Sequence, residues 1–328
     1  MQKTNTEISF TLLLLSLLFV ACSTPTVSSD DSDENSEKVE QEDRSSSSDM
    51  SNSKEADRSS SSEKKTESSS SENLSELDCS SAGKEDCLNF LKGVTGWSWN
   101  VSKEYRFNPD IEYGYMTDSR DGQVYRTVKV GEQTWMAENL NFDPGQGGSG
   151  NTKYEWSWCF DNDPKKCAVA GRLYTWAAAI DSVALATDED NPMDCGFARA
   201  CTIPSKLQGI CPSGWHLPTD IEWRILFNEF GWGKEAENLK SQTGWEEENF
   251  YGDDGGCGTD SVGFSVLPAG YRDDDSSFYD DGLEAHFWGA EEFSGGDACG
   301  MNIHYNHDTA YLYCDDKDYG FSIRCLKD

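Results

Sequence analysis

The sequence predicts an α+β fold for the globular part of the chain, and two observations predict it. Apolar and polar residues alternate in many short segments separated by Gly, Asn and Asp, which is typical of antiparallel strands. Only two segments show the spacing of an amphipathic helix. All eleven tryptophans lie after residue 79, so the apolar area needed for one core is concentrated there.

The strands are predicted from period-two alternation. Residues 124–130 and 133–136 predict a β-hairpin around a turn at Gly131 and Glu132. Further strands are expected at 262–266, 301–305, 310–314 and 321–325, and the turn at Asn306-His307 separates the third of these strands from the second.

The two helices are predicted from spacing and from capping signals. Apolar residues between 173 and 180 recur at i, i+3, i+4 and i+7 and so form one helical face. The second helix is expected to start at Thr219, because Glu222 completes a capping box with it, and to end near Phe230, before Gly231.

The N-terminal residues predict export. Residues 8–20 form an apolar run that is shorter than the roughly 20 residues needed to span a bilayer but has the length of a signal-peptide core. The run ends in Phe19-Val20-Ala21-Cys22, which resembles the bacterial lipobox. We therefore expect a signal peptide at 1–21 and a lipid anchor on Cys22; the alternative is an ordinary secretory signal. By the lipoprotein-sorting rule, Ser23 after the cysteine implies an outer-membrane location, with the domain exposed at the cell surface.

Residues 22–78 predict a disordered tether. Residues 23–78 carry a net charge of −10 and no aromatic side chain, so they cannot bury enough apolar area to offset the entropy of ordering. As a random coil this segment would reach roughly 40 Å. A short stapled prefix is expected at 79–117, followed by the main domain at 118–328.

The charge excludes some partners. The formal net charge is −33, of which about −23 belongs to the part after residue 78. Nucleic acid and anionic lipid are therefore unfavourable partners, and any contact with a membrane must come from the lipid anchor. A solvated acidic surface is the preferred interpretation of the remaining charge.

The twelve cysteines predict disulfides in an oxidising compartment, since only four histidines are present and zinc-site spacings are missing. Proximity in the sequence suggests three pairs. If Asn306-His307 is a two-residue loop, facing residue numbers sum to 613, which places Cys299 opposite Cys314. Cys257 is left unpaired. The expected pairs are Cys79–Cys87, Cys159–Cys167, Cys195–Cys201, Cys299–Cys314 and Cys211–Cys325.

Several motifs together resemble a known family. They are Asp118-Ser119-Arg120-Asp121-Gly122-Gln123, Trp135-Met136-Ala137-Glu138-Asn139-Leu140, Gly171-Arg172-Leu173-Tyr174-Thr175-Trp176, Cys211-Pro212-Ser213-Gly214-Trp215-His216-Leu217-Pro218 and Gly320-Phe321-Ser322-Ile323-Arg324-Cys325. In this order they resemble the Fibrobacter succinogenes major paralogous domain, from about residue 118 to the C-terminus. That family occurs largely in surface lipoproteins and has no established activity, so the resemblance implies location and fold.

A more distant resemblance refines the expected fold. The segment from Trp215 to Trp223 is similar to the helix-opening motif of formylglycine-generating enzymes, which implies a C-type-lectin-like architecture of two main helices and many short antiparallel strands. The closely spaced cysteine pair of those enzymes is not matched, because Cys299 and Cys314 are too far apart. The calcium-dependent sugar motifs of true C-type lectins are also missing. The resemblance therefore implies no catalytic residue.

The sequence favours a binding or envelope-structural module without catalysis, because no nucleophile elbow and no recognisable catalytic histidine occur. Aromatic rings beside carboxylates suit polysaccharide adhesion, although most such rings fill a core. The ligand-binding candidates are Trp245, Tyr251, Tyr271, Tyr279 and Trp288. An envelope protein is the other candidate partner. The alternative function is a secreted enzyme, either glycoside hydrolase-like or a cysteine-dependent oxidoreductase.

No cofactor is expected. Four oxygen-rich loops suit Ca²⁺, but none has the spacing of an EF-hand, and solvated loops are the preferred interpretation. These loops are Asp161-Asn162-Asp163, Asp253-Asp254, Asp273-Asp274-Asp275 and Asp315-Asp316.

Overall fold

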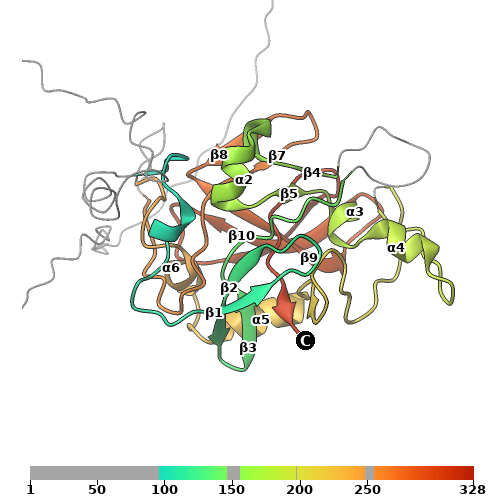
Figure 1. Ribbon diagram of the computed structural model, residues 1–328, viewed down its shortest axis with the longest axis horizontal. Helices are drawn as coiled ribbons and strands as arrows, with labels where there is room; N and C mark the ends of the chain where they lie inside the picture. Colours follow the sequence, from blue (N-terminus) through green and yellow to red (C-terminus); the bar gives the residue numbers. More distant parts are fainter. Residues whose placement is uncertain (1–95, 146–155, 197, 248–254) are drawn as a thin grey trace, which may run out of the picture. The chain divides into compact units, whose positions relative to one another are not determined.

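The computed structural model describes residues 96–145, 156–196, 198–247 and 255–328 (Figure 1). Within these ranges the chain forms two five-stranded sheets, one two-stranded sheet and a few short helices. The predicted signal peptide at 1–21, the tether at 22–78 with Cys22, the Cys79–Cys87 pair and Tyr251 lie outside the described residues.

The first sheet contains the predicted hairpin. Its spatial order is β1 (Gly114–Thr117), β2 (Val124–Val130), β3 (Gln133–Met136), β12 (Leu326–Lys327) and β6 (Trp215–His216). Val130 faces Gln133 across the turn, and Gly131 there has a φ of 57°, a left-handed value that glycine adopts without a steric penalty. The hairpin prediction is confirmed. The described part of the prefix joins this sheet through β1, which pairs with β2.

The second sheet carries the surface on which the later sections depend. Its spatial order is β11 (Tyr311–Asp316), β10 (Asp297–His304), β9 (Glu284–Glu292), β7 (Ala269–Arg272) and β8 (Phe278–Asp281). All neighbours are antiparallel except β7 and β9. Cys299 faces Cys314, as the predicted register requires. The connecting loop is longer than the predicted two residues. The same number of residues is added on each side of the turn, so the numbers of facing residues still sum to 613.

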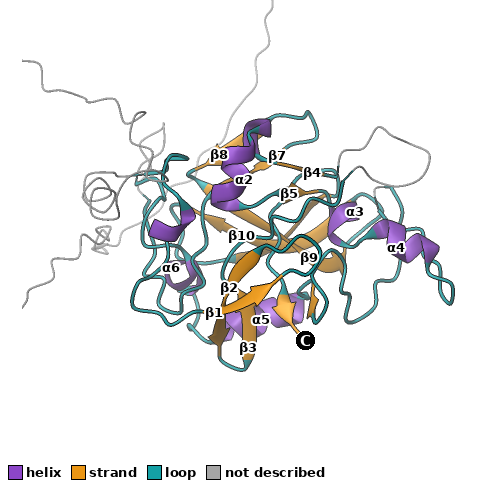
Figure 2. Ribbon diagram, in the orientation of Figure 1, coloured by secondary structure: helices purple, strands orange, loops and turns teal. Residues whose placement is uncertain are grey.

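The helices are few and short, and loops join most of the strands (Figure 2). The predicted capping box is confirmed: Thr219 accepts from the backbone N–H of Glu222, whose carboxylate accepts from the N–H of Thr219. The helices are α2 (Pro164–Ala170), α3 (Trp176–Ala179), α4 (Ser182–Thr187), α5 (Asp220–Asn228) and α6 (Glu235–Leu239), with 3₁₀ turns η1 (Lys103–Tyr105) and η2 (Phe160–Asn162). The small sheet pairs β4 (Ser157–Trp158) with β5 (Leu173–Tyr174).

Three predicted elements were wrong in part. Leu173 begins strand β5 rather than a helix, because Thr175 caps the following helix and so sets its start. Residues 262–266 are not a strand, since Gly263 and Ser265 have φ values of 73° and 53°. Of residues 321–325 only Phe321 and Ser322 form isolated bridges, and the last strand is instead β12.

The core has two main parts, one on each side of the central strands. One part contains α5, whose Trp223 stacks on Trp135 with ring centroids 4.7 Å apart and packs near Phe287 of β9. The other part gathers Trp176, Trp288 and neighbouring apolar side chains. One face of the second sheet is thus covered by α5 along β9 and β10, while the opposite face is covered over only part of its length.

Buried cations connect the loops to this core. Arg324 is 1% exposed and donates to Oδ1 of Asn139 at 2.7 Å, to the carbonyl of Ser265 at 3.0 Å and to the carbonyl of Phe264. Two fully buried lysines act in the same way. Lys317 donates to three carbonyls and to the carboxylate of Glu292, and Lys240 donates to three carbonyls. Each ammonium also lies over a tryptophan ring.

Four of the predicted disulfides are confirmed: Cys159–Cys167, Cys195–Cys201, Cys211–Cys325 and Cys299–Cys314. The prediction for Cys257 was wrong, because this residue is also disulfide-bonded. The other eight described cysteines pair among themselves, so the partner of Cys257 lies outside the described residues. Sequence spacing could not reveal this bond, because its two ends are far apart in the chain.

Replacing Arg324 with methionine should lower the free energy of unfolding by more than about 3 kcal/mol, because buried carbonyls then lose their donor. Urea denaturation of the oxidised protein measures this loss. Lys129→Met, at a side chain that is 61% exposed, is the matched control and should change stability by less than about 0.5 kcal/mol. Equal effects of the two substitutions would contradict the structural role of Arg324.

Peptide mapping of the non-reduced protein should find the four bonds named above and a fifth that joins Cys257 to a cysteine before residue 96. The cysteines there are Cys22, Cys79 and Cys87. Alkylation of Cys257 in the native, oxidised protein would show that this fifth bond does not form.

Candidate functional site

The structure separates the predicted ligand-binding residues into two groups. Trp245 and Trp288 are fully buried, and their indole nitrogens donate to the carbonyls of Val266 and Tyr174 at 3.1 and 2.7 Å. Neither ring can stack on a ligand, so these two predictions were wrong; the largest apolar side chains fill the core. Tyr271 and Tyr279, in contrast, lie next to each other on β7 and β8.

Tyr271 and Tyr279 belong to a larger surface on the second sheet. Side chains alternate between the two faces of a strand, so the register decides which of them share a face. Tyr311 faces Asn302, which faces His286, and the His286 ring lies 5.0 Å from the Tyr271 ring. Tyr271 in turn faces Tyr279. We call the surface formed by Tyr271, Tyr279, Tyr311, Tyr313 and Tyr319 the tyrosine face.

The tyrosine face is partly open to solvent. Tyr279, Tyr311 and Tyr313 are 39%, 42% and 60% exposed. The Tyr271 ring lies 5.9 Å from the rings of both Tyr279 and Tyr319, which are tilted by 38° and 32° relative to it. At about 4.8 Å between strands, the row from Tyr311 to Tyr279 spans roughly 19 Å. The face is therefore wide and aromatic.

A carboxylate and two histidines form a hydrogen-bonded group within this face. Glu284 lies 2.7 Å from Nε2 of His286 and 2.8 Å from Nδ1 of His304. Burial alone would raise the pKa of Glu284, but the hydrogen bonds and charges of the two histidines lower it to about 2. Glu284 is therefore ionised at neutral pH and available as a hydrogen-bond acceptor.

Asn302 carries the one feature of the face that lacks an internal explanation. The side chain is 7% exposed, and its amide nitrogen lies 3.1 Å from Nδ1 of His286. Its Oδ1 atom has no hydrogen-bond partner among the described residues. A buried polar atom without a partner costs stability, and Oδ1 of Asn302 is the atom of this kind that lies beside the exposed rings; seven other such atoms lie elsewhere in the described residues.

Further carboxylates surround the tyrosines. Burial, followed by the charges of Asp280, Asp273 and Glu284, raises the pKa of Tyr271. Burial and the charges of Asp273, Asp315 and Asp274 raise the pKa of Tyr319 to about 12. Both phenols thus stay protonated at neutral pH and can donate hydrogen bonds.

The sequence could have revealed more of this surface than it did. Tyr311 and Tyr313 lie on the strand whose register was predicted, and period-two alternation places them on one face with Asn302. They are absent from the predicted ligand-binding residues, which all lie between Trp245 and Trp288. Tyr319 could not have been found in this way, because it reaches the face from the segment after β11.

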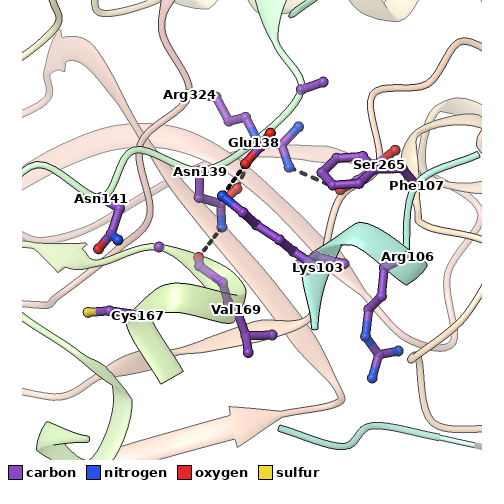
Figure 3. Close-up of a pocket in the computed structure, with 14 residues that line it drawn as sticks. Lys103, Arg106, Phe107, Glu138, Asn139, Asn141, Cys167, Val169, Ser265 and Arg324 are labelled. Atoms are coloured by element: carbon purple, nitrogen blue, oxygen red, sulfur yellow. Dashed lines mark hydrogen bonds and ion pairs between the residues drawn. The ribbon is translucent and has the colours of Figure 1, made fainter. Parts of the chain in front are cut away.

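A second concave region lies between η1, the 137–139 segment and α2, with a volume of about 350 Å³ that includes its open mouth. Figure 3 shows Lys103 reaching towards Glu138. Glu138 also accepts from the backbone N–H of Arg126 at 2.9 Å, and Asn139 donates to the carbonyl of Ala170 at 2.9 Å. Most polar groups of this pocket that the contacts describe are paired with one another, whereas Nε of Arg106 is buried without a partner.

The described acidic loops have structural roles where their contacts are visible. Asp161 pairs with Lys166, and Asp163 caps α2. Within the described ranges no three His, Cys, Asp or Glu side chains converge in a way that could hold a metal ion. Asp253 and Asp254 lie outside those ranges. Among the helices of the described residues, none is long and apolar enough to cross a membrane.

Comparison with known proteins gives one match. A family model described as the Fibrobacter succinogenes major domain matches residues 128–327, which is more than half of the chain. No curated protein and no solved structure matches the chain. The C-type-lectin-like architecture therefore remains a prediction.

The low pKa of Glu284 predicts how the domain responds to acid. A carboxylate whose pKa is lowered on folding contributes stability that is present above its unfolded pKa, near 4.5, and lost as the pH falls towards 2. Glu284→Gln should therefore cost about 3 kcal/mol near pH 6 and much less near pH 2. Denaturation at both pH values measures this change. Glu132→Gln, at a side chain that is 97% exposed, is the control, and a cost of Glu284→Gln that is independent of pH would contradict the assignment.

Proposed function

The chain belongs to the Fibrobacter succinogenes major domain family, and we propose that its globular domain is a non-catalytic module that binds polysaccharide through the tyrosine face. The observation that carries the proposal is the buried amide of Asn302, unpaired at Oδ1 and set in a row of tyrosine rings. This oxygen is an acceptor that no donor of the described residues satisfies.

The chemistry of the face matches that of a sugar chain. Sugar rings present C–H faces that pack on aromatic rings, and their hydroxyl groups both donate and accept hydrogen bonds. The exposed rings of Tyr279, Tyr311 and Tyr313 offer the packing surface, and Glu284 and Asn302 offer acceptors between them. The row of about 19 Å extends beyond a single sugar ring, which favours a chain over a monosaccharide.

We further propose that the module is displayed on the cell surface. The expected signal peptide at 1–21, the acylated Cys22 and the tether at 22–78 would attach the domain to the outer membrane and hold it away from the headgroups. A tethered module of this kind suits adhesion, because many weak sites on one cell act together. An envelope protein is the other partner that this display would suit.

One observation favours a second candidate, a glycoside hydrolase-like activity. Burial and the charge of Glu284 raise the pKa of Asp280, whereas the pKa of Glu284 is lowered to about 2. Glycosidases use two carboxyl groups whose environments shift their pKa values in opposite directions. Release of reducing sugar from a polysaccharide that binds, abolished by Asp280→Asn, would support this candidate over a purely binding role. A cysteine-dependent oxidoreductase would need a free thiol, but the nine cysteines of the described residues are all disulfide-bonded.

The proposed function predicts a loss of binding on removal of the exposed rings. Tyr279→Ala and Tyr313→Ala should each weaken binding to a polysaccharide such as cellulose or xylan by about tenfold, because each removes a packing surface. Pull-down isotherms with the oxidised chain measure this loss.

Tyr115→Ala is the matched control, because Tyr115 is 67% exposed but lies on the first sheet. Its binding should equal that of the unmodified chain. Binding that survives both substitutions on the tyrosine face, or that Tyr115→Ala reduces equally, would refute the assignment of this face.

A further inference from the structure

We infer that the tyrosine face selects uncharged glycan chains and rejects polyuronates, an inference that rests on the proposed function and specifies its ligand class. Its basis is the combination of an acceptor-rich, negatively charged surface with a buried amide oxygen that lacks a donor.

Carboxylates dominate the charge around the tyrosine face. Tyr271 lies in the field of Asp280, Asp273 and Glu284, and Tyr319 lies in the field of Asp273, Asp315 and Asp274. Burial and neighbouring acidic groups raise the pKa of Asp315 and of Asp318. A ligand that carries one carboxylate on every sugar unit would add its charges to this group, and the repulsion would be repeated along the chain.

The cationic groups near the face are already engaged. His286 and His304 both bond to Glu284. The Arg272 guanidinium lies 3.8 Å from the centre of the Trp158 ring and donates to the carbonyl of Asp273. Each of these three groups thus already has a partner within the protein.

Three further basic side chains lie in the interior of the domain. Arg324, Lys317 and Lys240 are at most 3% exposed and donate to main-chain carbonyls. These three groups are therefore unavailable to a ligand on the tyrosine face. An anionic polymer would find no counter-charge on this face.

The hydrogen-bonding groups of the face also favour an uncharged ligand. Oδ1 of Asn302 is an acceptor without a donor, whereas the carboxylate of Glu284 already accepts from His286 and His304. The hydroxyl groups of an uncharged sugar donate. An ionised uronate carboxylate can only accept, so at neutral pH it could not donate to Oδ1 of Asn302 and would depend on donors such as the phenol groups of Tyr271 and Tyr319.

The test compares uncharged and anionic polysaccharides on the same protein. The full oxidised chain is titrated against cellulose, unsubstituted xylan and mannan as uncharged probes, and against polygalacturonate, in 20 mM and 500 mM NaCl. We expect at least one uncharged probe to bind with an affinity that salt changes less than about twofold. Polygalacturonate should bind at least about tenfold more weakly at low salt, and added salt should narrow this difference.

A charge-neutralised variant tests whether electrostatic repulsion, rather than a poor fit of shape, weakens the binding of polygalacturonate. The double substitution Asp273→Asn with Asp315→Asn should strengthen polygalacturonate binding at low salt by about tenfold and leave the uncharged probe within about twofold. The matched control, Asp121→Asn with Glu132→Gln, removes the same charge from the first sheet, where both residues are exposed, and should change neither affinity.

The outcomes distinguish the inference from the proposed function. If a folded chain binds no probe at all, the proposed function fails. If it binds an uncharged probe and polygalacturonate equally at low salt, or if the charge-neutralised variant behaves like its control, the proposed function stands and the charge selectivity is wrong.

Discussion

The fold depends on buried cations that donate to main-chain carbonyls. A domain made of short strands and long connections leaves many carbonyls without a partner in regular secondary structure, and each one that is buried must find a donor. Arg324 supplies donors to the carbonyls of Phe264 and Ser265 and to Asn139, so it ties the 264–265 loop to the segment after β3 and to the C-terminal segment. Lys317 and Lys240 do the same for other loops. The aromatic rings beneath these groups supply part of the attraction that a carboxylate would otherwise give.

This arrangement explains how one sheet can be rigid and still expose aromatic residues. One face of the second sheet packs on α5 through Phe287 and Met301. The other face is covered by Trp288 and Phe321, whose rings lie 4.3 Å apart, and exposes Tyr279, Tyr311 and Tyr313 on the outer strands β8 and β11. The Cys299–Cys314 bond joins β10 to β11, and the Lys317–Glu292 pair joins the segment after β11 to β9. The tyrosines are therefore held by a framework that does not depend on them.

The sequence predicted the parts of this structure that follow from local chemistry. The capping box at Thr219, the hairpin at Gly131 and the register that pairs Cys299 with Cys314 each depend on a short pattern. What it could not predict depends on contacts between distant segments. The 262–266 segment alternates like a strand, but the domain uses it as a turn-rich loop whose carbonyls bind Arg324. Trp288 was predicted to lie at the surface because the sequence around it is polar, but strand β9 places its ring in the core. Tyr271 and Tyr279 were predicted individually, but their neighbours in space come from β10, β11 and the C-terminal segment.

The central claim is that the unpaired amide of Asn302 and the tyrosine rings around it bind a sugar chain. NMR spectroscopy of the isotope-labelled, oxidised chain tests it most directly, during titration with a soluble uncharged oligosaccharide from cellulose or xylan. The account predicts that the side-chain amide signals of Asn302 and the ring signals of Tyr271 and Tyr279 shift together and saturate. Shifts confined to the pocket around Lys103 and Glu138, or no shifts with any uncharged oligosaccharide, would contradict it.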